Sequence, residues 1–184
     1  MRIFEFEDNK VVNKEYLYKA LGLDLSRKYV ISFVGGGGKT SSIYKLAYEL
    51  ASFGKKVIVT TTTHMQMPKD KVVLNDNISE VKDILEKNNF VTVGVKVKVK
   101  VKDDKITSVS EDVAMELSGI CDFLLIEADG AKMLPLKVPA DHEPVILNIT
   151  NMVIGICGID ALGKKINKTC HRANIVSKLL NKDA

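Results

Sequence analysis

The sequence contains no tryptophan and few cysteines, prolines or arginines. Its three cysteines, Cys121, Cys157 and Cys170, are widely spaced and form no CxxC pair, which excludes a disulfide framework. An odd number of cysteines, two of them beside apolar stretches, indicates inert thiols in a reducing compartment. No run reaches the ~20 apolar residues of a membrane helix, and residues 1–8 lack the apolar core of a signal peptide. We therefore expect a soluble, cytoplasmic protein that does not bind membranes.

Arginine is the scarcer of the two strongly basic residues. Only Arg2, Arg27 and Arg172 occur among 27 lysines and arginines. Arginine makes the bidentate contacts with phosphates and base edges, so this chain is not expected to bind nucleic acid. The net charge of +4 is mildly basic and favours a small anionic ligand.

The chain has the composition of an ordinary globular protein and the pattern of a βαβ unit. Hydrophobic residues make up 46% of its 184 residues, which suits a single domain over residues 1–184. Residues 29–34 predict a buried strand, and apolar positions within 43–51 recur at helical spacing up to Gly54. A second apolar strand begins at 57–59. This order predicts an α/β fold with a mostly parallel sheet flanked by helices.

The remaining segments extend this pattern and interrupt it once. We expect helices around 78–85 and 171–180 and buried strands over 123–126 and 152–157. Between about 90 and 110, valines alternate with polar residues, chiefly lysine. That period of two predicts an antiparallel β-hairpin, inserted in the parallel sheet or added to its edge. Its lysines either protect an exposed edge from aggregation or bind an anionic partner.

Four glycines separate the first strand from its helix. The run is Gly35-Gly36-Gly37-Gly38, followed by Lys39, Thr40 and Ser41. Such a turn directs backbone N–H groups and the positive end of the helix at one point, where phosphates bind. Lys39 would contact the β and γ phosphates, and the Thr40 hydroxyl would bind Mg²⁺. The alternative is a tight turn with a surface lysine.

The glycine run also distinguishes between classes of nucleotide fold. The strict GxxxxGK[ST] pattern fails, because Phe33 takes the place of the first glycine. The run matches a variant xGGxGKT loop better, and it does not fit the GxGxxG pattern of nicotinamide folds. We therefore expect a P-loop NTPase-like domain that binds ATP or GTP with Mg²⁺.

A run of four threonines, Thr60 to Thr63, precedes His64 at the predicted carboxyl end of the second strand. Ligands bind at that edge in open α/β folds. Alternate threonines face opposite sides of a strand, so about two of the four would reach the site, with Thr62 and Thr63 as the candidates. A purely structural run is also open, because threonine is a good strand residue. His64 is a candidate base, a hydrogen-bond donor or a structural histidine.

Two carboxylates follow the third strand. Glu127 and Asp129 lie just before Gly130, where the chain can turn sharply. A metal–phosphate site needs a carboxylate at such a strand end. Asp129 is the favoured Mg²⁺ ligand beside Thr40, and Glu127 is the candidate water-orienting base. The reverse assignment and a simple strand-end turn remain alternatives.

The polar, proline-rich segment 132–143 is either a substrate lid or a solvated connection. Arg172, beside His171, could stabilise a transferred phosphate or lie on the surface. The histidines are isolated from one another and from the cysteines, so no metal cluster of the zinc type is expected.

Taken together, these blocks resemble the YqeC family, described as accessory proteins of selenium-dependent molybdenum hydroxylases. The shared blocks are FVGGGGKTS (33–41), TTTTHM (60–65), EADGAK (127–132), LPLK (134–137), DHEP (141–144), GIDALG (158–163) and HR (171–172). The resemblance implies a role in maturing such a hydroxylase, by modifying or inserting its cofactor. The molybdenum cofactor or the hydroxylase is then an expected partner. Relatives are expected to carry a further C-terminal segment.

Three functions remain open at this point. The first is an NTP-hydrolysing maturation factor with Mg²⁺ and ATP or GTP. The second is a small-molecule kinase or nucleotide-dependent ligase, with its acceptor held by residues 60–64 and the 132–143 segment. The third is a non-catalytic chaperone that binds a nucleotide or a nucleotide-bearing cofactor. The joint presence of Lys39, Thr40 and an acidic strand end favours the first two.

Overall fold

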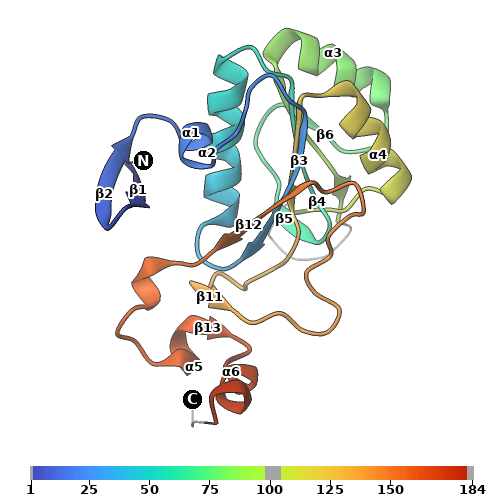
Figure 1. Ribbon diagram of the computed structural model, residues 1–184. Helices are drawn as coiled ribbons and strands as arrows, with labels where there is room; N and C mark the ends of the chain where they lie inside the picture. The colour runs from blue at the N-terminus through green and yellow to red at the C-terminus, as the bar shows by residue number, and fades with distance from the viewer. Residues whose placement is uncertain (1, 98–104, 182–184) are drawn as a thin grey trace.

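The computed structural model describes residues 2–97 and 105–181. Its centre is a six-stranded parallel sheet with helices on both faces (Figure 1). The strand order is β12-β3-β10-β4-β7-β6. The strands are β3 (Tyr29–Gly35), β4 (Val57–Thr61), β6 (Val72–Val73), β7 (Phe90–Val93), β10 (Phe123–Glu127) and β12 (Met152–Ile156). The predicted α/β fold with a mostly parallel sheet is confirmed.

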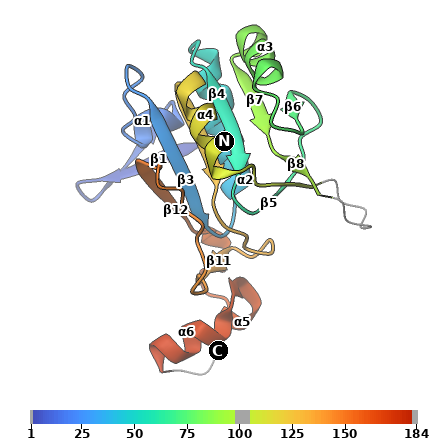
Figure 2. The same ribbon diagram turned by 90° about the vertical axis from the view of Figure 1, so that its right-hand side faces the viewer.

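The helices cover the two faces of the sheet separately. Helix α2 (Lys39–Ser52) packs on one face through Ile43, Leu46 and Leu50. Helices α3 (Ile78–Asn88) and α4 (Glu111–Ile120) pack on the other face through Val81, Leu85 and Leu117 (Figure 2). Successive strand side chains alternate between these two layers, so the strands are apolar on both faces. This burial explains why their sequences are continuous apolar runs.

Strand order determines which chain segments meet at the carboxyl edge of the sheet. Strand β10 pairs with both β3 and β4, although it follows them in the sequence. Glu127 is thereby opposite Phe33 on one side and Thr61 on the other. The end of β10 therefore lies between the glycine run and the threonine run, at the carboxyl edge of the sheet.

The alternating segment 90–110 is divided between two sheets. Residues 90–93 form β7 inside the parallel sheet, where all four are buried. Strands β8 (Val95–Lys96) and β9 (Lys105–Thr107) are antiparallel and join β5 (His64–Gln66) in a separate three-stranded sheet. The antiparallel prediction is thus confirmed for 95–96 and 105–107, but it was wrong for 90–93. Most of the lysine-rich stretch lies outside the described residues.

Small elements flank the main sheet. Strands β1 (Ile3–Glu7) and β2 (Lys10–Lys14) form an N-terminal hairpin, followed by α1 (Leu17–Ala20). Towards the C-terminus, β11 (Leu136–Lys137) pairs in parallel with β13 (Cys170–His171). The 3₁₀ helix η1 (Ile159–Ala161) precedes α5 (Ile166–Thr169), and α6 (Ala173–Leu180) follows β13. Figure 2 shows α5 and α6 beyond β11, away from the main sheet. Within the described ranges, no helix has the length and apolar character to cross a membrane.

Candidate functional site

The glycine loop, residues 35–38, connects β3 to α2 and is closely packed on its outer side. Gly35 has φ of +100°, and a Cβ there would overlap the Ile156 carbonyl oxygen. A Cβ on Gly36 would clash with the backbone of 134–136, and one on Gly37 with the backbone of Gly158. These residues are glycines because neighbouring backbone leaves no room for a side chain. Gly38 has open space around it but has φ of +109° as the N-cap of α2.

Lys39 is buried and faces back toward the loop. Its ammonium donates a hydrogen bond to the Gly35 carbonyl oxygen and lies 3.0 Å from Asp129 Oδ1. The other carboxylate oxygen of Asp129 accepts a hydrogen bond of 3.0 Å from the Gly35 N–H. Asp129 therefore contacts the start of the glycine loop and the lysine that ends it. This carboxylate holds the loop and its cation in one arrangement.

Thr40 contacts the other predicted carboxyl group. Its hydroxyl donates a hydrogen bond of 2.6 Å to Glu127 Oε2. The pKa of Glu127 is raised, chiefly because the carboxyl group is buried and further because of the nearby Asp129 charge. The Thr40 hydrogen bond and the Lys39 charge lower this pKa, but by less than burial raises it. The Glu127 carbonyl accepts hydrogen bonds from the Thr61 hydroxyl (2.9 Å) and the Thr62 N–H (3.1 Å). The strand ends of β10 and β4 are thereby joined beside the first turn of α2.

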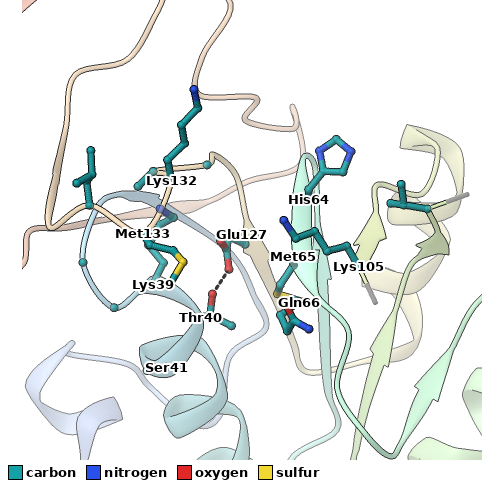
Figure 3. Close-up of a pocket in the computed structure, with 16 residues that line it drawn as sticks. Lys39, Thr40, Ser41, His64, Met65, Gln66, Lys105, Glu127, Lys132 and Met133 are labelled. Carbon is teal, nitrogen blue, oxygen red and sulfur yellow. Dashed lines mark hydrogen bonds between the residues drawn. The ribbon is translucent and has the colours of Figure 1, made fainter. Parts of the chain in front are cut away.

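A cleft of about 850 Å³ opens in front of this group (Figure 3). One wall is the glycine loop and the first turn of α2, and the opposite wall is β5 with Val97 and Lys105. Residues 130–134 complete the lining. Figure 3 shows the Lys105 side chain running from β9 into the cleft, whereas the ends of Lys132 and His64 point away from Thr40. Among the described residues that line the cleft, Glu127 carries the one carboxyl group, and the other ionisable side chains are chiefly those of lysines.

The structure places most of the predicted phosphate and catalytic residues around this cleft. Those that line it are Gly37, Gly38, Lys39, Thr40, Ser41, His64 and Glu127. Gly35 and Gly36 belong to the part of the loop that does not line the cleft, and they lie against Ile156 and the 134–136 backbone. Asp129 lies behind the loop and is 2% exposed. The candidate site therefore consists of residues that line the cleft and of buried residues behind them that hold them in place.

Thr62 and Thr63 are outside the lining of this cleft. The Thr62 hydroxyl donates to the Val145 carbonyl oxygen at 2.8 Å, and the Thr63 N–H donates to the Thr61 hydroxyl at 3.0 Å. Strand β4 ends at Thr61, so strand alternation does not continue through these residues. Here the threonines satisfy backbone groups at the turn between β4 and β5, which agrees with the structural alternative.

The surroundings of the two carboxylates differ in their suitability for a metal ion. Asp129 contacts two ammonium groups and one N–H, because Lys137 Nζ also lies 3.2 Å from its Oδ2. Glu127 and the Thr40 hydroxyl instead offer two adjacent oxygens at the cleft. No cluster of three or more His, Cys, Asp or Glu residues occurs in the described part of the chain. A Mg²⁺ ion, which keeps several waters and binds substrate phosphates, suits such a sparse oxygen site.

Sequence reasoning missed the ion pairs behind the loop. It places Lys137 and Glu143 only in a lid or connection, and it treats Arg172 alone. Lys137 Nζ lies 2.8 Å from Glu143 Oε2, and Arg172 contacts the same oxygen. A lysine between Leu136 and Val138 is the one local sign of a buried charge. Residues 134–135 also pack on the glycine loop, so this segment forms a wall of the site.

Sequence comparison supports the resemblance seen in the motifs. A family described as "YqeC protein" matches residues 31–174, from the glycine loop to beyond Arg172. A protein of Escherichia coli (strain K12) described as "Uncharacterized protein YqeC" is 35% identical over 165 residues. That alignment covers 83% of this chain and 62% of the E. coli protein, so the chain spans less than two thirds of that relative's length. No solved structure matches the chain.

Proposed function

This chain belongs to the YqeC family, and we propose that it is a Mg²⁺–nucleotide-binding maturation factor. In this proposal it hydrolyses ATP or GTP while assisting assembly or selenation of the molybdenum cofactor site of a selenium-dependent hydroxylase. The nucleotide part rests on the geometry of the cleft. The maturation part rests on the family resemblance, and so do the molybdenum cofactor and the hydroxylase as partners.

The contact between Thr40 and Glu127 is the observation that supports nucleotide binding most directly. A hydroxyl in the first turn of a helix and a carboxyl at the end of the neighbouring strand lie 2.6 Å apart at one cleft. P-loop NTPases place a Ser or Thr and an acidic strand end together in this way to hold Mg²⁺. The α2 N-terminus adds backbone N–H groups and positive potential. The same cleft is therefore suited to both the metal and the phosphates.

In the proposed site, Thr40 and Glu127 hold the metal ion and the glycine loop with Lys39 holds the phosphates. Mg²⁺ would supply charge neutralisation for the phosphate that is transferred. Because its pKa is raised by burial, Glu127 binds a proton more readily than an exposed glutamate, and a metal ion held there would displace that proton. Asp129 takes the supporting role here: it positions Lys39 and the Gly35 N–H.

Lys39 can exchange partners without leaving a buried charge unbalanced. Its ammonium contacts Asp129, which also contacts Lys137 at 3.2 Å. A phosphate oxygen in the cleft would draw the Lys39 ammonium forward, and Asp129 would keep Lys137 as its counter-ion. The ion pair to Asp129 is then compatible with a phosphate-binding role for Lys39.

The far wall of the cleft favours a second candidate function, a small-molecule kinase or nucleotide-dependent ligase. His64, Gln66 and Lys105 line that wall, opposite the glycine loop. Space bounded by polar groups on the side away from the phosphates is what an acceptor molecule needs. His64 is the candidate base for such an acceptor. A binding protein without turnover is the third candidate.

The proposal also places the protein in the cytoplasm. Cys121, Cys157 and Cys170 are all free thiols. Burial raises the pKa of the Cys121 thiol to about 12, which keeps it protonated and unreactive. An exposed thiol such as Cys157 suits a reducing compartment.

Nucleotide binding is tested by calorimetric and thermal titration with Mg-ATP and Mg-GTP. A nucleotide at a hundred times its Kd should stabilise the wild-type chain by ~2.7 kcal/mol. Lys39→Ala should lose most of the affinity but stay folded, because Asp129 keeps Lys137. Lys45→Ala, a change farther along α2, is the matched control and should bind normally. Equal affinities for wild type and Lys39→Ala would refute the assignment.

Turnover distinguishes the three candidates. Phosphate release by the purified protein alone supports hydrolysis. Turnover that requires an added acceptor supports the kinase or ligase. Tight binding of Mg-nucleotide with neither kind of turnover supports the non-catalytic chaperone.

A further inference from the structure

Five side chains of alternating charge form an ion-pair network from the glycine loop to the C-terminal helix. Lys39 Nζ lies 3.0 Å from Asp129 Oδ1, and Asp129 Oδ2 lies 3.2 Å from Lys137 Nζ. Lys137 Nζ is 2.8 Å from Glu143 Oε2, which Arg172 also contacts. Arg172 is the N-cap of α6. The ion-pair network therefore connects the first residue of α2 with the start of α6.

Lys137 has the most buried side chain of this ion-pair network. Its side chain is 0% exposed, and its strand β11 pairs with β13, where it is opposite His171. A buried ammonium is costly unless carboxylates surround it, and Asp129 and Glu143 do so from two sides. A buried ion pair adds little net stability compared with apolar residues of the same size. Its placement behind the phosphate loop calls for a role other than stability.

Asp129 is the member of the ion-pair network that contacts the glycine loop. Its carboxylate accepts a hydrogen bond from the Gly35 N–H and lies beside the ammonium groups of Lys39 and Lys137. The position of the carboxylate therefore depends on Lys137 as well as on Lys39. A shift of Asp129 would move both the Gly35 N–H and the Lys39 ammonium.

We propose that Lys137 is a positioning residue, which holds Asp129 so that Lys39 and Gly35 are aimed for an anionic ligand. Through Glu143 and Arg172, Lys137 also connects that arrangement to α6. The connection to α6 rests on the proposed binding of nucleotide phosphates. The positioning of Gly35 does not, because it concerns the protein without ligand.

Ligand binding would reach α6 by an exchange of ion-pair partners. When Lys39 turns to a phosphate, Asp129 is left with Lys137 as its counter-ion and attracts it more strongly. Lys137 then interacts less with Glu143, which is left to Arg172. Arg172, the N-cap of α6, also donates to the Val138 carbonyl oxygen at 3.3 Å, so its side chain joins the start of α6 to the residue that follows β11. Linkage requires that a change at Glu143 also alters affinity at the loop.

The first experiment measures hydrogen exchange of single amides by NMR in the protein without ligand. Lys137→Met should speed exchange at the Gly35 N–H by about tenfold or more, because its charged acceptor is no longer held. Exchange at Val59, in the middle of β4, should be unchanged. Lys137→Arg should restore the slow exchange at Gly35. Lys45→Met, which removes the ion pair between Lys45 and Glu49 on α2, is the matched control.

A purely structural role predicts something different. If Lys137→Met accelerates Val59 as much as Gly35, or leaves Gly35 unchanged, Lys137 does not position the loop. Should this variant not fold, the double variant Lys137→Met with Glu143→Gln removes one charge of each sign and is measured in its place, with the same two outcomes.

The second experiment tests the connection to α6 with Mg-ATP and Mg-GTP. Saturating nucleotide should change exchange across residues 173–180 in the wild type. In Glu143→Gln that change should fall at least about threefold while calorimetry still detects binding. An undiminished change in Glu143→Gln, or none in a wild type that binds, overturns the connection. A wild type that binds neither nucleotide rejects the proposed function and the connection with it, whereas the Gly35 measurement still decides the positioning role.

Discussion

Glu127 and Asp129 are two residues apart and have opposite environments. Asp129 is surrounded by cations and an N–H, whereas Glu127 has one hydroxyl donor and a pKa raised by burial. A strand places alternate residues on the same side, yet here the chain turns after Glu127 and directs Asp129 behind the loop. The sequence predicted a carboxylate at this place but could not assign the roles, because the deciding contacts of Asp129 with Lys39 and Lys137 form only on folding.

Glu127→Gln should abolish the Mg²⁺ dependence of nucleotide binding. The amide keeps a hydrogen-bond partner for Thr40 but removes the charge that a metal ion needs. Asp129→Asn should weaken binding with and without metal alike, because it acts through Lys39. Calorimetry with and without Mg²⁺ checks both. A normal metal titration in Glu127→Gln would return the metal role to Asp129.

Glu143 should make stability depend on acid pH. Burial raises the pKa of its carboxyl, but the hydrogen bond from Arg172 and the contact with Lys137 outweigh it and hold the pKa at about 2, below the usual 4.5. A depressed pKa stabilises the folded state at pH values above the ordinary pKa of the group. That contribution is lost as the pH falls from about 4.5 to about 2. Urea unfolding of wild type and Glu143→Gln should differ most near neutral pH and converge near pH 2. Glu116→Gln, at an exposed position on α4, is the matched control.

Among the elements, apolar runs predicted four strands of the main sheet, and helical periodicity predicted α2 and α3. Strands β3, β4, β10 and β12 begin within about two residues of their expected positions, since each is a run of apolar residues that leaves a strong local signal. The valine alternation misled at 90–93, because β7 reads like a half-exposed strand and yet is buried on both faces. Strand β11 and the Lys137–Glu143–Arg172 contacts have no local signature. They arise from pairing between distant segments.

The glycine loop should tolerate a methyl group only where space allows. Gly35→Ala should destabilise the protein by about 3 kcal/mol or more, because both the positive φ and the contact with Ile156 oppose it. Gly38→Ala faces open space and should cost about 1–2 kcal/mol for its φ alone. Gly119→Ala, inside α4 with nothing nearby, should stabilise by about 0.5–1 kcal/mol. Urea unfolding measures all three, and an equal cost at Gly35 and Gly38 would contradict the packing argument.

On the scale of the whole molecule, the cleft lies between two sheets of different kinds. The carboxyl edge of the parallel sheet provides Glu127 and the glycine loop, and the small antiparallel sheet provides Lys105 on the opposite wall. The sequence indicated both sheets but gave no sign that they face each other. A side chain from β9 thus lies across the cleft from the glycine loop, where it could contact the proposed nucleotide.

Lys105→Ala should weaken Mg-triphosphate binding more than Mg-diphosphate binding, by about fivefold, because it removes a cation opposite the loop. Lys82→Ala, on the exposed side of α3, should change neither affinity. Calorimetry with ATP and ADP, or GTP and GDP, measures the ratio. An unchanged ratio would mean that Lys105 does not reach the terminal phosphate.

The insertion of β10 between β3 and β4 has a consequence for synthesis. A ribosome that has released residues 1–122 has made both neighbours of the central strand but not the strand itself. Until residues 123–127 emerge, the edges of β3 and β4 that pair with β10 have no strand partner and stay open to chaperones and proteases. Cotranslational folding of the parallel sheet should therefore wait for the arrival of β10, so nascent chains that end before it should be digested rapidly.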